Sequence, residues 1–185
     1  MKIGITGHSE GIGNDIYSNL IKEYDVIGFS RSNGFNIKNP DKIIEQLENC
    51  DVFINNAYEK NYQTILFKLI FDKWKFLSKT IINMNSSCVY HSSDWAPEYA
   101  NNKKELKEVS LNTIRNYKNK KVRVINLYPS TLSTHKGFES LNKLDTENLA
   151  KIINWLIKQP QEIEIREMSI YCTTLEKEFK IDKLI

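Results

Sequence analysis

The chain has 185 residues, of which 41% are hydrophobic and 26% are charged. This length and balance predict one folded domain over residues 1–185, with a full-sized core. The net charge of +3, with no block of like charges, gives no reason to expect a nucleic-acid partner. No apolar run approaches the roughly 20 residues that cross a membrane, so we expect no membrane span.

The cysteines and the first residues of the sequence indicate the cellular compartment of the protein. Cys50, Cys88 and Cys172 lie far apart and form no CxxC motif, which favours free thiols in a reducing compartment. The sequence begins directly on an apolar run, without the pattern of a signal peptide. We therefore expect a cytoplasmic protein. No group of residues has the spacing of metal ligands, so we also expect no metal.

Apolar periodicity predicts strands and helices that alternate along the chain. Expected strands cover residues 3–5, 25–30, 51–55, 80–84, 121–127 and about 164–171, with a short extended piece at 35–37. Expected helices start near residue 14 and cover 40–49, 61–77 and 99–117, and another begins at 146. This alternation predicts an α/β fold, a three-layer doubly wound parallel sheet with helices on both faces.

A glycine loop separates the first strand from the first helix. It carries Gly7, Gly11 and Gly13 in the sequence TGHSEGIG. Glycine permits a tight turn and a close approach of the backbone to a pyrophosphate, and the N–H groups and dipole of the helix start favour its negative charge. Such loops also occur with nothing bound, so this motif alone leaves both interpretations open.

Further motifs follow in the order found in the short-chain dehydrogenase/reductases, which this sequence resembles over nearly its whole length. The family's TGxxxGxG loop matches from Thr6 to Gly13, and its NNAG motif appears as Asn55, Asn56 and Ala57, with Tyr58 in place of glycine. The resemblance implies a Rossmann fold that binds a nicotinamide dinucleotide.

The family's catalytic motifs also have counterparts. Its YxxxK pair is Tyr99 and Lys103, and its serine, thirteen residues before the tyrosine, is Ser86. Its PG segment and the threonine five residues later appear as Pro129 and Thr134, with Ser130 in place of glycine.

The paired residues suggest acid–base chemistry. Tyr99 and Lys103 share one helical face, and a nearby ammonium would lower the pKa of the phenol, which could then act as a general acid or base. The resemblance implies that Lys103 also binds the nicotinamide ribose and that Ser86 donates a hydrogen bond to the substrate oxygen. The alternatives are a surface tyrosine beside a surface lysine, and Ser87 in the role of Ser86.

The family's fourth catalytic residue is an asparagine near the start of the long helix before Ser86. Asn61 is the asparagine in roughly that place. The alternative role for Asn61 is capping of that helix.

The end of the second strand bears on cofactor choice. Ser30, Arg31 and Ser32 stand where an NAD-preferring site has a carboxylate, and a guanidinium matches a 2′-phosphate. The sequence therefore favours NADP(H) over NAD(H), with loose acceptance of NAD as the alternative. Other expected cofactor contacts are Ser9, Ile12, Asn36, Ile37, Asn55, Asn56, Ala57, Pro129 and Thr134.

These observations predict an NADP(H)-dependent oxidoreductase that interconverts a small carbonyl and an alcohol. The alternative is a catalytically weak or inactive nucleotide-binding or regulatory protein on the same fold, since a helix is missing before residue 39, the loop at 134–144 is brief and Tyr58 adds bulk. An epimerase or dehydratase is less favoured, because little chain follows the last strand. The resemblance also implies a homodimer or homotetramer, because the helix around Leu69 and the helix starting at Tyr99 are the usual pairing surfaces in the family.

Overall fold

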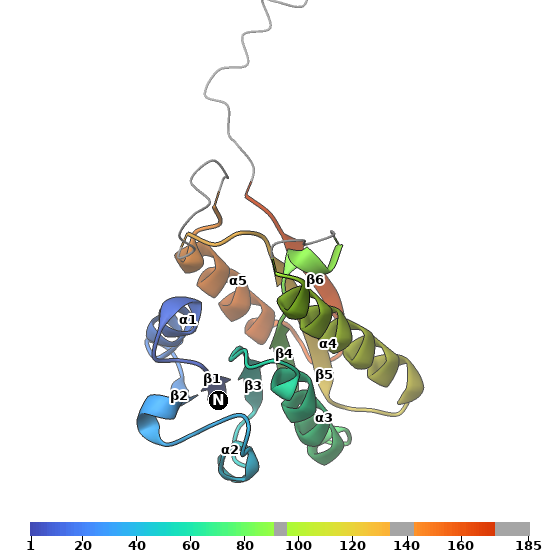
Figure 1. The fold of residues 1–185 in the computed structure, drawn as a ribbon. Coiled ribbons are helices and arrows are strands. Elements are labelled where there is room, and N and C mark those ends of the chain that lie inside the picture. Colours follow the sequence, from blue (N-terminus) through green and yellow to red (C-terminus); the bar gives the residue numbers. More distant parts are fainter. Residues whose placement is uncertain (91–95, 134–142, 173–185) are drawn as a thin grey trace, which may run out of the picture.

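Six parallel strands form one sheet at the centre of the molecule (Figure 1). The computed structural model describes residues 1–90, 96–133 and 143–172, and within these ranges the strand order is β2-β1-β3-β4-β5-β6. The strands are β1 (Lys2–Thr6), β2 (Asp25–Phe29), β3 (Val52–Asn55), β4 (Thr80–Met84), β5 (Arg123–Pro129) and β6 (Glu167–Ile170).

Helices cover both faces of this sheet. The α-helices are α1 (Gly11–Leu20), α2 (Asp41–Leu47), α3 (Tyr62–Trp74), α4 (Pro97–Asn116) and α5 (Thr146–Lys158), and two 3₁₀ helices are η1 (Arg31–Asn33) and η2 (Ser87–Tyr90). Helices α1 and α5 pack together on one face, and α2, α3 and α4 lie on the other (Figure 1). The predicted three-layer doubly wound fold is confirmed.

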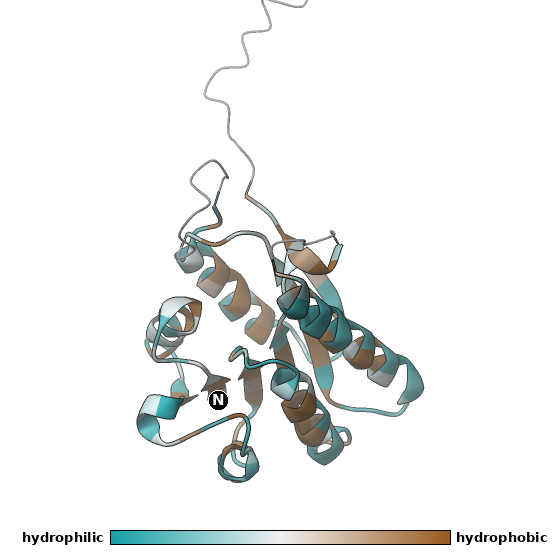
Figure 2. Cartoon of the chain, viewed as in Figure 1, coloured by the Kyte–Doolittle hydropathy of each residue, from teal (hydrophilic) through white to brown (hydrophobic). Residues whose placement is uncertain are grey.

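Apolar side chains fill both spaces between sheet and helices. Ile5 and Ile54 pack toward α1 and α5, while Phe53 packs with Phe67 and Trp74 on the α3 side. Because both faces are covered, the central strands are almost continuously hydrophobic, as Figure 2 shows in brown. Buried polar side chains lie toward the carboxyl ends of these strands, among them Thr6, Asn55 and Asn83.

Some boundaries differ from the expected ones. Helix α1 begins at Gly11, so the last two loop glycines lie in its first turn. Helix α4 begins at Pro97, a residue that suits the first helical position. Asp145 caps α5 by accepting a hydrogen bond from the Glu147 N–H at 3.0 Å.

The connection between β2 and α2 is short, as the sequence predicts. It holds η1 and a bridge between Asn36 and Asn39, so the expected extended piece at 35–37 is not a strand of the sheet. The usual doubly wound sheet has one more strand beyond the second. Here β2 is the edge strand, and η1 follows directly at its carboxyl end.

Helix α3 is buried on one side only. Leu66, Phe67 and Ile70 face the core, whereas Ile65 is 37% exposed and Leu69 is 39% exposed. The wide apolar surface predicted for this helix thus leaves a hydrophobic stripe outside. Among the described helices, none combines the length and the apolar character that crossing a membrane requires.

Candidate active site

The glycine loop lies where the chain order of the sheet reverses, between β1 and β3. Thr6 is fully buried there, and its Oγ1 accepts hydrogen bonds from the backbone N–H groups of Asn56 and Ala57, both at 3.0 Å. Asn56 Nδ2 in turn donates to the Thr6 carbonyl at 3.0 Å. These contacts hold together the carboxyl ends of two neighbouring strands, which is where doubly wound proteins bind ligands.

Two glycines of the loop are required by its geometry. Gly7 has a φ of +74°, a left-handed conformation that side chains disfavour. A Cβ on Gly13 would lie 1.9 Å from the Gly7 carbonyl oxygen, so only glycine allows the helix to begin this close to the loop. The first turn of α1 can therefore present its N–H groups and its dipole to a phosphate.

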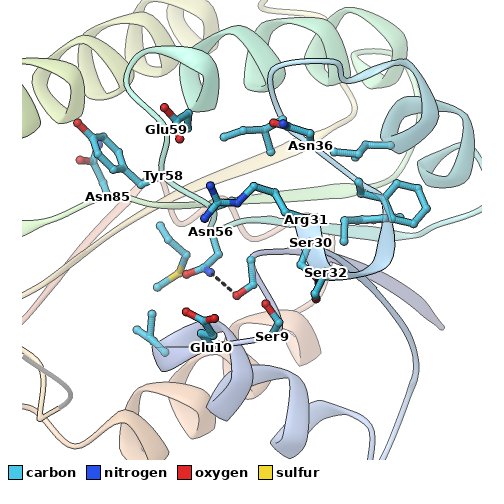
Figure 3. A pocket seen from close by; sticks show the side chains of 18 of the residues that line it. Ser9, Glu10, Ser30, Arg31, Ser32, Asn36, Asn56, Tyr58, Glu59 and Asn85 are labelled. Atoms are coloured by element: carbon cyan, nitrogen blue, oxygen red, sulfur yellow. Dashed lines mark hydrogen bonds between the residues drawn. The ribbon is translucent and has the colours of Figure 1, made fainter.

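A cavity of about 460 Å³ extends from this loop to the start of α4 (Figure 3). Most of the predicted site residues line it: Gly7, Ser9, Ile12, Ser30, Arg31, Ser32, Asn36, Ile37, Asn56, Ala57, Tyr99, Lys103 and Pro129. The predicted residues that do not line it are Gly11, Gly13, Asn55, Asn61 and Ser86. Thr134 lies outside the described residues.

Sequence reasoning missed several other residues of the cavity wall. They are Glu10, Phe29, Phe35, Ile43, Glu59, Met84, Asn85 and Leu132. Tyr58 also lines the cavity, and the sequence had marked it as added bulk at the glycine position of the NNAG motif. Apart from Glu10, which lies inside the glycine loop, the missed residues belong to none of the motifs described above. Their position follows from how the strands and helices pack.

Arg31 lies at the outer end of the cavity. Its side chain reaches into the cavity from η1, with Ser9 and Glu10 on one side and Asn36 and Glu59 on the other (Figure 3). Glu59 forms an ion pair with Lys38 at 3.0 Å. Within the part of the chain that the structure describes, the Arg31 guanidinium has neither an ion pair nor a hydrogen bond and is exposed. It is therefore available to an anionic ligand.

Lys103 lies at the inner end and is only 3% exposed. Its Nζ donates to the Gln63 Oε1 at 2.8 Å and to the Met84 carbonyl at 2.7 Å. Burial lowers the pKa of Lys103 to about 7, because the charged form loses its hydration. The pKa of this amine is thus far below that of an exposed lysine.

Tyr99 is half-buried one helical turn before Lys103. Burial raises the pKa of Tyr99 to about 12, while the Ser86 side chain acts in the opposite direction. The expectation that Lys103 lowers this pKa is therefore wrong for this structure. The Lys103 Nζ is directed at Gln63 and Met84, and both side chains lose solvent, which disfavours the phenolate and the ammonium alike.

Ser86 follows β4 and interacts with Tyr99, whose pKa it lowers. Its Oγ also accepts a hydrogen bond from the Cys88 N–H at 3.3 Å. Ser87, the alternative residue, begins η2 instead. The thirteen-residue spacing thus selects the serine that lies beside Tyr99.

Asn61 and Gln63 differ in what they contact. Asn61 precedes α3, is exposed and makes no capping hydrogen bond through its side chain. Gln63 is 2% exposed and makes the contact with Lys103. A signal was present in the sequence, because Gln63 is in helical phase with Phe67 and Ile70 and so had to be buried with a partner.

Tyr58 covers the inner end of the cavity. Its ring packs edge-on against Tyr99 with centroids 4.8 Å apart, and the Lys103 Nζ lies 5.5 Å from its centroid. The Tyr58 hydroxyl accepts a hydrogen bond from Asn102 Nδ2 at 3.1 Å. Where the related motif has glycine, this chain has an aromatic side chain against the predicted catalytic pair.

Among the described residues, no three His, Cys, Asp or Glu side chains lie close enough together to hold a metal ion. The polar groups near Tyr99 include the Ser86 and Tyr58 hydroxyls, the Cys88 thiol and the Lys103 amine. This set can donate and accept hydrogen bonds and protons around a polar ligand.

No protein-family model matches the sequence, and no curated protein matches it. Solved structures match over most of their length. A short-chain dehydrogenase/reductase from Vibrio parahaemolyticus superposes with a TM-score of 0.73 at 13% identity, covering 91% of this chain and 98% of that one.

Two further neighbours have the same fold. Serine dehydrogenase from Escherichia coli gives a TM-score of 0.73 at 16% identity, over 92% of this chain and 97% of its own. An alcohol dehydrogenase from the archaeon Thermococcus sibiricus, complexed with 5-hydroxy-NADP, gives a TM-score of 0.71 at 16% identity, over 92% of this chain and 96% of its own. The chain therefore has the Rossmann fold of the short-chain dehydrogenase/reductases, as its motifs predict.

Proposed function

We propose that this protein is an oxidoreductase of the short-chain dehydrogenase/reductase type that uses NADP(H) to interconvert a small carbonyl compound and its alcohol. The observation that carries the proposal is that Tyr99 and Lys103 line the inner end of one cavity, with Ser86 interacting with Tyr99 beside it. The glycine loop and Arg31 lie toward its outer end. This arrangement matches a ligand with phosphates at one end and a reactive ring at the other.

In the proposed reaction, Tyr99, Ser86 and Lys103 each have a separate role. Tyr99, protonated at neutral pH, is the general acid that donates its proton to the carbonyl oxygen during reduction. Ser86 donates a hydrogen bond to the same oxygen, and Lys103 donates to a ribose hydroxyl. When bound, NADPH supplies the hydride. In the oxidation direction Tyr99 must first lose its proton, which its raised pKa disfavours.

The preference for NADP(H) rests on Arg31. At the end of β2, the planar guanidinium of Arg31 can donate two parallel hydrogen bonds to the oxygens of a phosphate. The Ser30 and Ser32 hydroxyls, which lie 2.7 Å apart, flank it and can donate as well. No carboxylate stands at the positions directly after β2, where a ribose diol would need one.

A fluorescence titration with NADPH and NADH tests this directly. We expect wild-type protein to bind NADPH at least about tenfold more tightly than NADH, since a charge-assisted hydrogen bond contributes roughly 1.5–3 kcal/mol. Arg31→Ala should abolish the preference and leave NADH binding unchanged. Arg115→Ala is the matched control, because Arg115 lies in the last turn of α4, away from the cavity. Failure of both nucleotides to bind at millimolar concentration would reject the proposal.

A second candidate function is nucleotide binding without turnover. The packing of Tyr58 against Tyr99 and beside Lys103 favours it, since this ring obstructs the inner end. Adding a panel of ketones and aldehydes to the NADPH complex separates the two functions. Consumption of NADPH supports the enzyme, and binding without any consumption supports the second function.

A homodimer or homotetramer that pairs through the helix around Leu69 and the helix of Tyr99 remains a prediction, as does a cytoplasmic location. The exposed stripe of α3 supports the first of these. The stripe includes Ile65 and Leu69, which are more exposed than hydrophobic side chains in a core. Analytical ultracentrifugation measures the assembly state, and a monomer at micromolar concentration would contradict the prediction.

A further inference from the structure

Gln63 is a buried amide in the first turn of α3. It is 2% exposed and shares a helix face with Phe67 and Ile70, which pack into the core. Burying an amide is unfavourable unless its polar atoms find partners. The contacts of Gln63 therefore indicate why a polar residue is placed here.

Each end of the Gln63 side chain has partners. Its Nε2 donates to the Asn55 carbonyl at 2.7 Å and to the Met84 carbonyl at 3.1 Å. Its Oε1 accepts from the Lys103 Nζ at 2.8 Å. The amide thus bridges the carboxyl ends of β3 and β4, and this bridge fixes the direction in which Oε1 points.

Three hydrogen-bonded asparagines, one on each of β3, β4 and β5, support the Gln63 bridge. Asn55 Nδ2 donates to the Gln63 carbonyl and to Asn83 Oδ1, both at 3.0 Å. Asn83 Nδ2 donates to Asn126 Oδ1 at 3.2 Å, and Ser110 on α4 donates to the same oxygen at 2.8 Å. Because these asparagines are in register on β3, β4 and β5, they tie Gln63 to three strands and to α4.

Lys103 depends on this framework for its orientation. An ammonium has three N–H donors, and two of them go to Gln63 and to the Met84 carbonyl. Within the described chain, no carboxylate forms an ion pair with Lys103. The titratable groups that face it are Tyr58 from the loop after β3, Tyr99 on α4 and Cys88 in η2. Because two N–H groups of the ammonium are held by these hydrogen bonds, the direction of the third N–H is also fixed.

We propose that Gln63 is a positioning residue for Lys103: through its Oε1 it holds the Nζ in place and favours its charged form, so that one N–H remains for a ligand in the cavity. Among the contacts of the described residues, Lys103 donates to Gln63, whereas Asn61, the residue that the sequence suggested near this helix start, is exposed. The inference deepens the proposed function and rests on it, because a ligand for the third N–H is part of that function.

Three variants test the proposal. Gln63→Met keeps the length and volume but removes the acceptor, and Gln63→Glu keeps an acceptor and adds a negative charge. Thr64→Val is the matched control, since Thr64 is the next residue, is 1% exposed, and has a hydroxyl without a partner in the described chain. The titration of Lys103 is followed by NMR of isotope-labelled lysine in the protein without cofactor, with Lys103→Arg to assign the signal.

We expect opposite shifts in the two glutamine variants. Losing the acceptor should lower the ammonium-to-amine ratio of Lys103 at pH 7 about tenfold, and the added carboxylate should raise it about tenfold, given the usual strength of a charge-assisted hydrogen bond. Thr64→Val should leave the ratio unchanged. In activity assays, the pKa of Lys103 seen in the pH dependence of kcat should fall in Gln63→Met and rise in Gln63→Glu.

Two outcomes would overturn the inference: no change of the Lys103 titration in either glutamine variant, or a shift of the same sign in both and in Thr64→Val, as a merely structural role would give. If Gln63→Met does not fold, the comparison of the Lys103 titration in Gln63→Glu with that in Thr64→Val tests the inference. Failure of the proposed function is a separate result, because it is the absence of nucleotide binding or carbonyl reduction in wild-type protein and leaves the NMR titration intact.

Discussion

The two ends of the cavity are built in different ways. At the outer end, Arg31 and the glycine loop present exposed groups carried by short, local turns at the ends of β2 and β1. At the inner end, Lys103 and Gln63 are almost fully buried and are held by residues from separate strands and helices. The outer end is thus suited to binding charge, and the inner end to controlling protons.

Loss of the Tyr99 hydroxyl is the sharpest way to separate the two ends. Tyr99→Phe should lower kcat by about 10²- to 10⁴-fold, the usual contribution of a general acid. The Kd for NADPH should stay within about twofold, since the binding groups at the outer end are untouched. Steady-state kinetics and a binding titration on the same preparation give both numbers.

Tyr117→Phe is the control for that variant. Tyr117 follows α4 and packs on Phe71, away from the cavity. If both variants reduce carbonyls at the wild-type rate, Tyr99 is not the general acid.

At the outer end, the corresponding change is Gly13→Ala. The added Cβ would lie 1.9 Å from the Gly7 carbonyl oxygen and 2.6 Å from Asn56 Nδ2, so the loop must shift. We expect NADPH to bind about 100-fold more weakly and the protein to lose about 1–3 kcal/mol of stability. At saturating NADPH, kcat should change little.

Gly34→Ala controls for the loss of stability alone. Gly34 has a φ of +85°, which strains any side chain, and a Cβ added there would meet no atom of the described chain within 4 Å. It also lies outside the residues that line the cavity. Equal weakening of NADPH binding in both glycine variants would mean that the loop has no special role in binding.

The inner end can also be tested through the pH dependence of stability. Burial holds the pKa of Lys103 at about 7, whereas an unfolded lysine titrates near 10.5. Between these values the unfolded chain binds more protons than the folded one, so stability rises with pH, by at most about 1.4 kcal/mol per pH unit. Lys103→Met should remove this slope, measured by urea unfolding between about pH 7 and pH 10.

Tyr99 sets the upper limit of the pH range in which stability rises with pH. Its raised pKa gives a stability contribution that is lost as pH rises beyond the ordinary tyrosine value near 10. Lys104→Met, at the neighbouring and less buried lysine, should keep the wild-type slope. An unchanged slope in Lys103→Met would contradict the depressed pKa of Lys103.

The same contrast explains what the sequence could predict. The glycine loop and the Tyr99–Lys103 pair are local patterns, so their spacing was enough to place the loop between β1 and α1 and the pair on α4, although α1 begins three residues earlier than expected. Gln63 was missed because its role depends on contacts with Asn55, Met84 and Lys103, which lie far from one another in the chain.

The direction of the Tyr99 pKa was predicted wrongly for a related reason. Spacing brings Lys103 near in sequence, but burial of both side chains decides the pKa, and burial depends on the whole fold. The sequence predicted a doubly wound parallel sheet but not the order of its strands, so the edge position of β2 became visible only in the structure.

Tyr58 covers the inner end of the cavity, and its removal has the smallest expected effect. If its ring must move before a ligand reaches Lys103, each binding event loses the packing against Tyr99, worth roughly 0.5–1.5 kcal/mol for an aromatic pair. Tyr58→Gly should therefore tighten NADPH binding by about two- to tenfold. Tyr58→Phe keeps the ring and removes only the hydrogen bond from Asn102, so it should bind like wild type. Weaker binding in Tyr58→Gly would mean that the ring supports the ligand, and the inner end would then be part of the binding site rather than an obstacle to it.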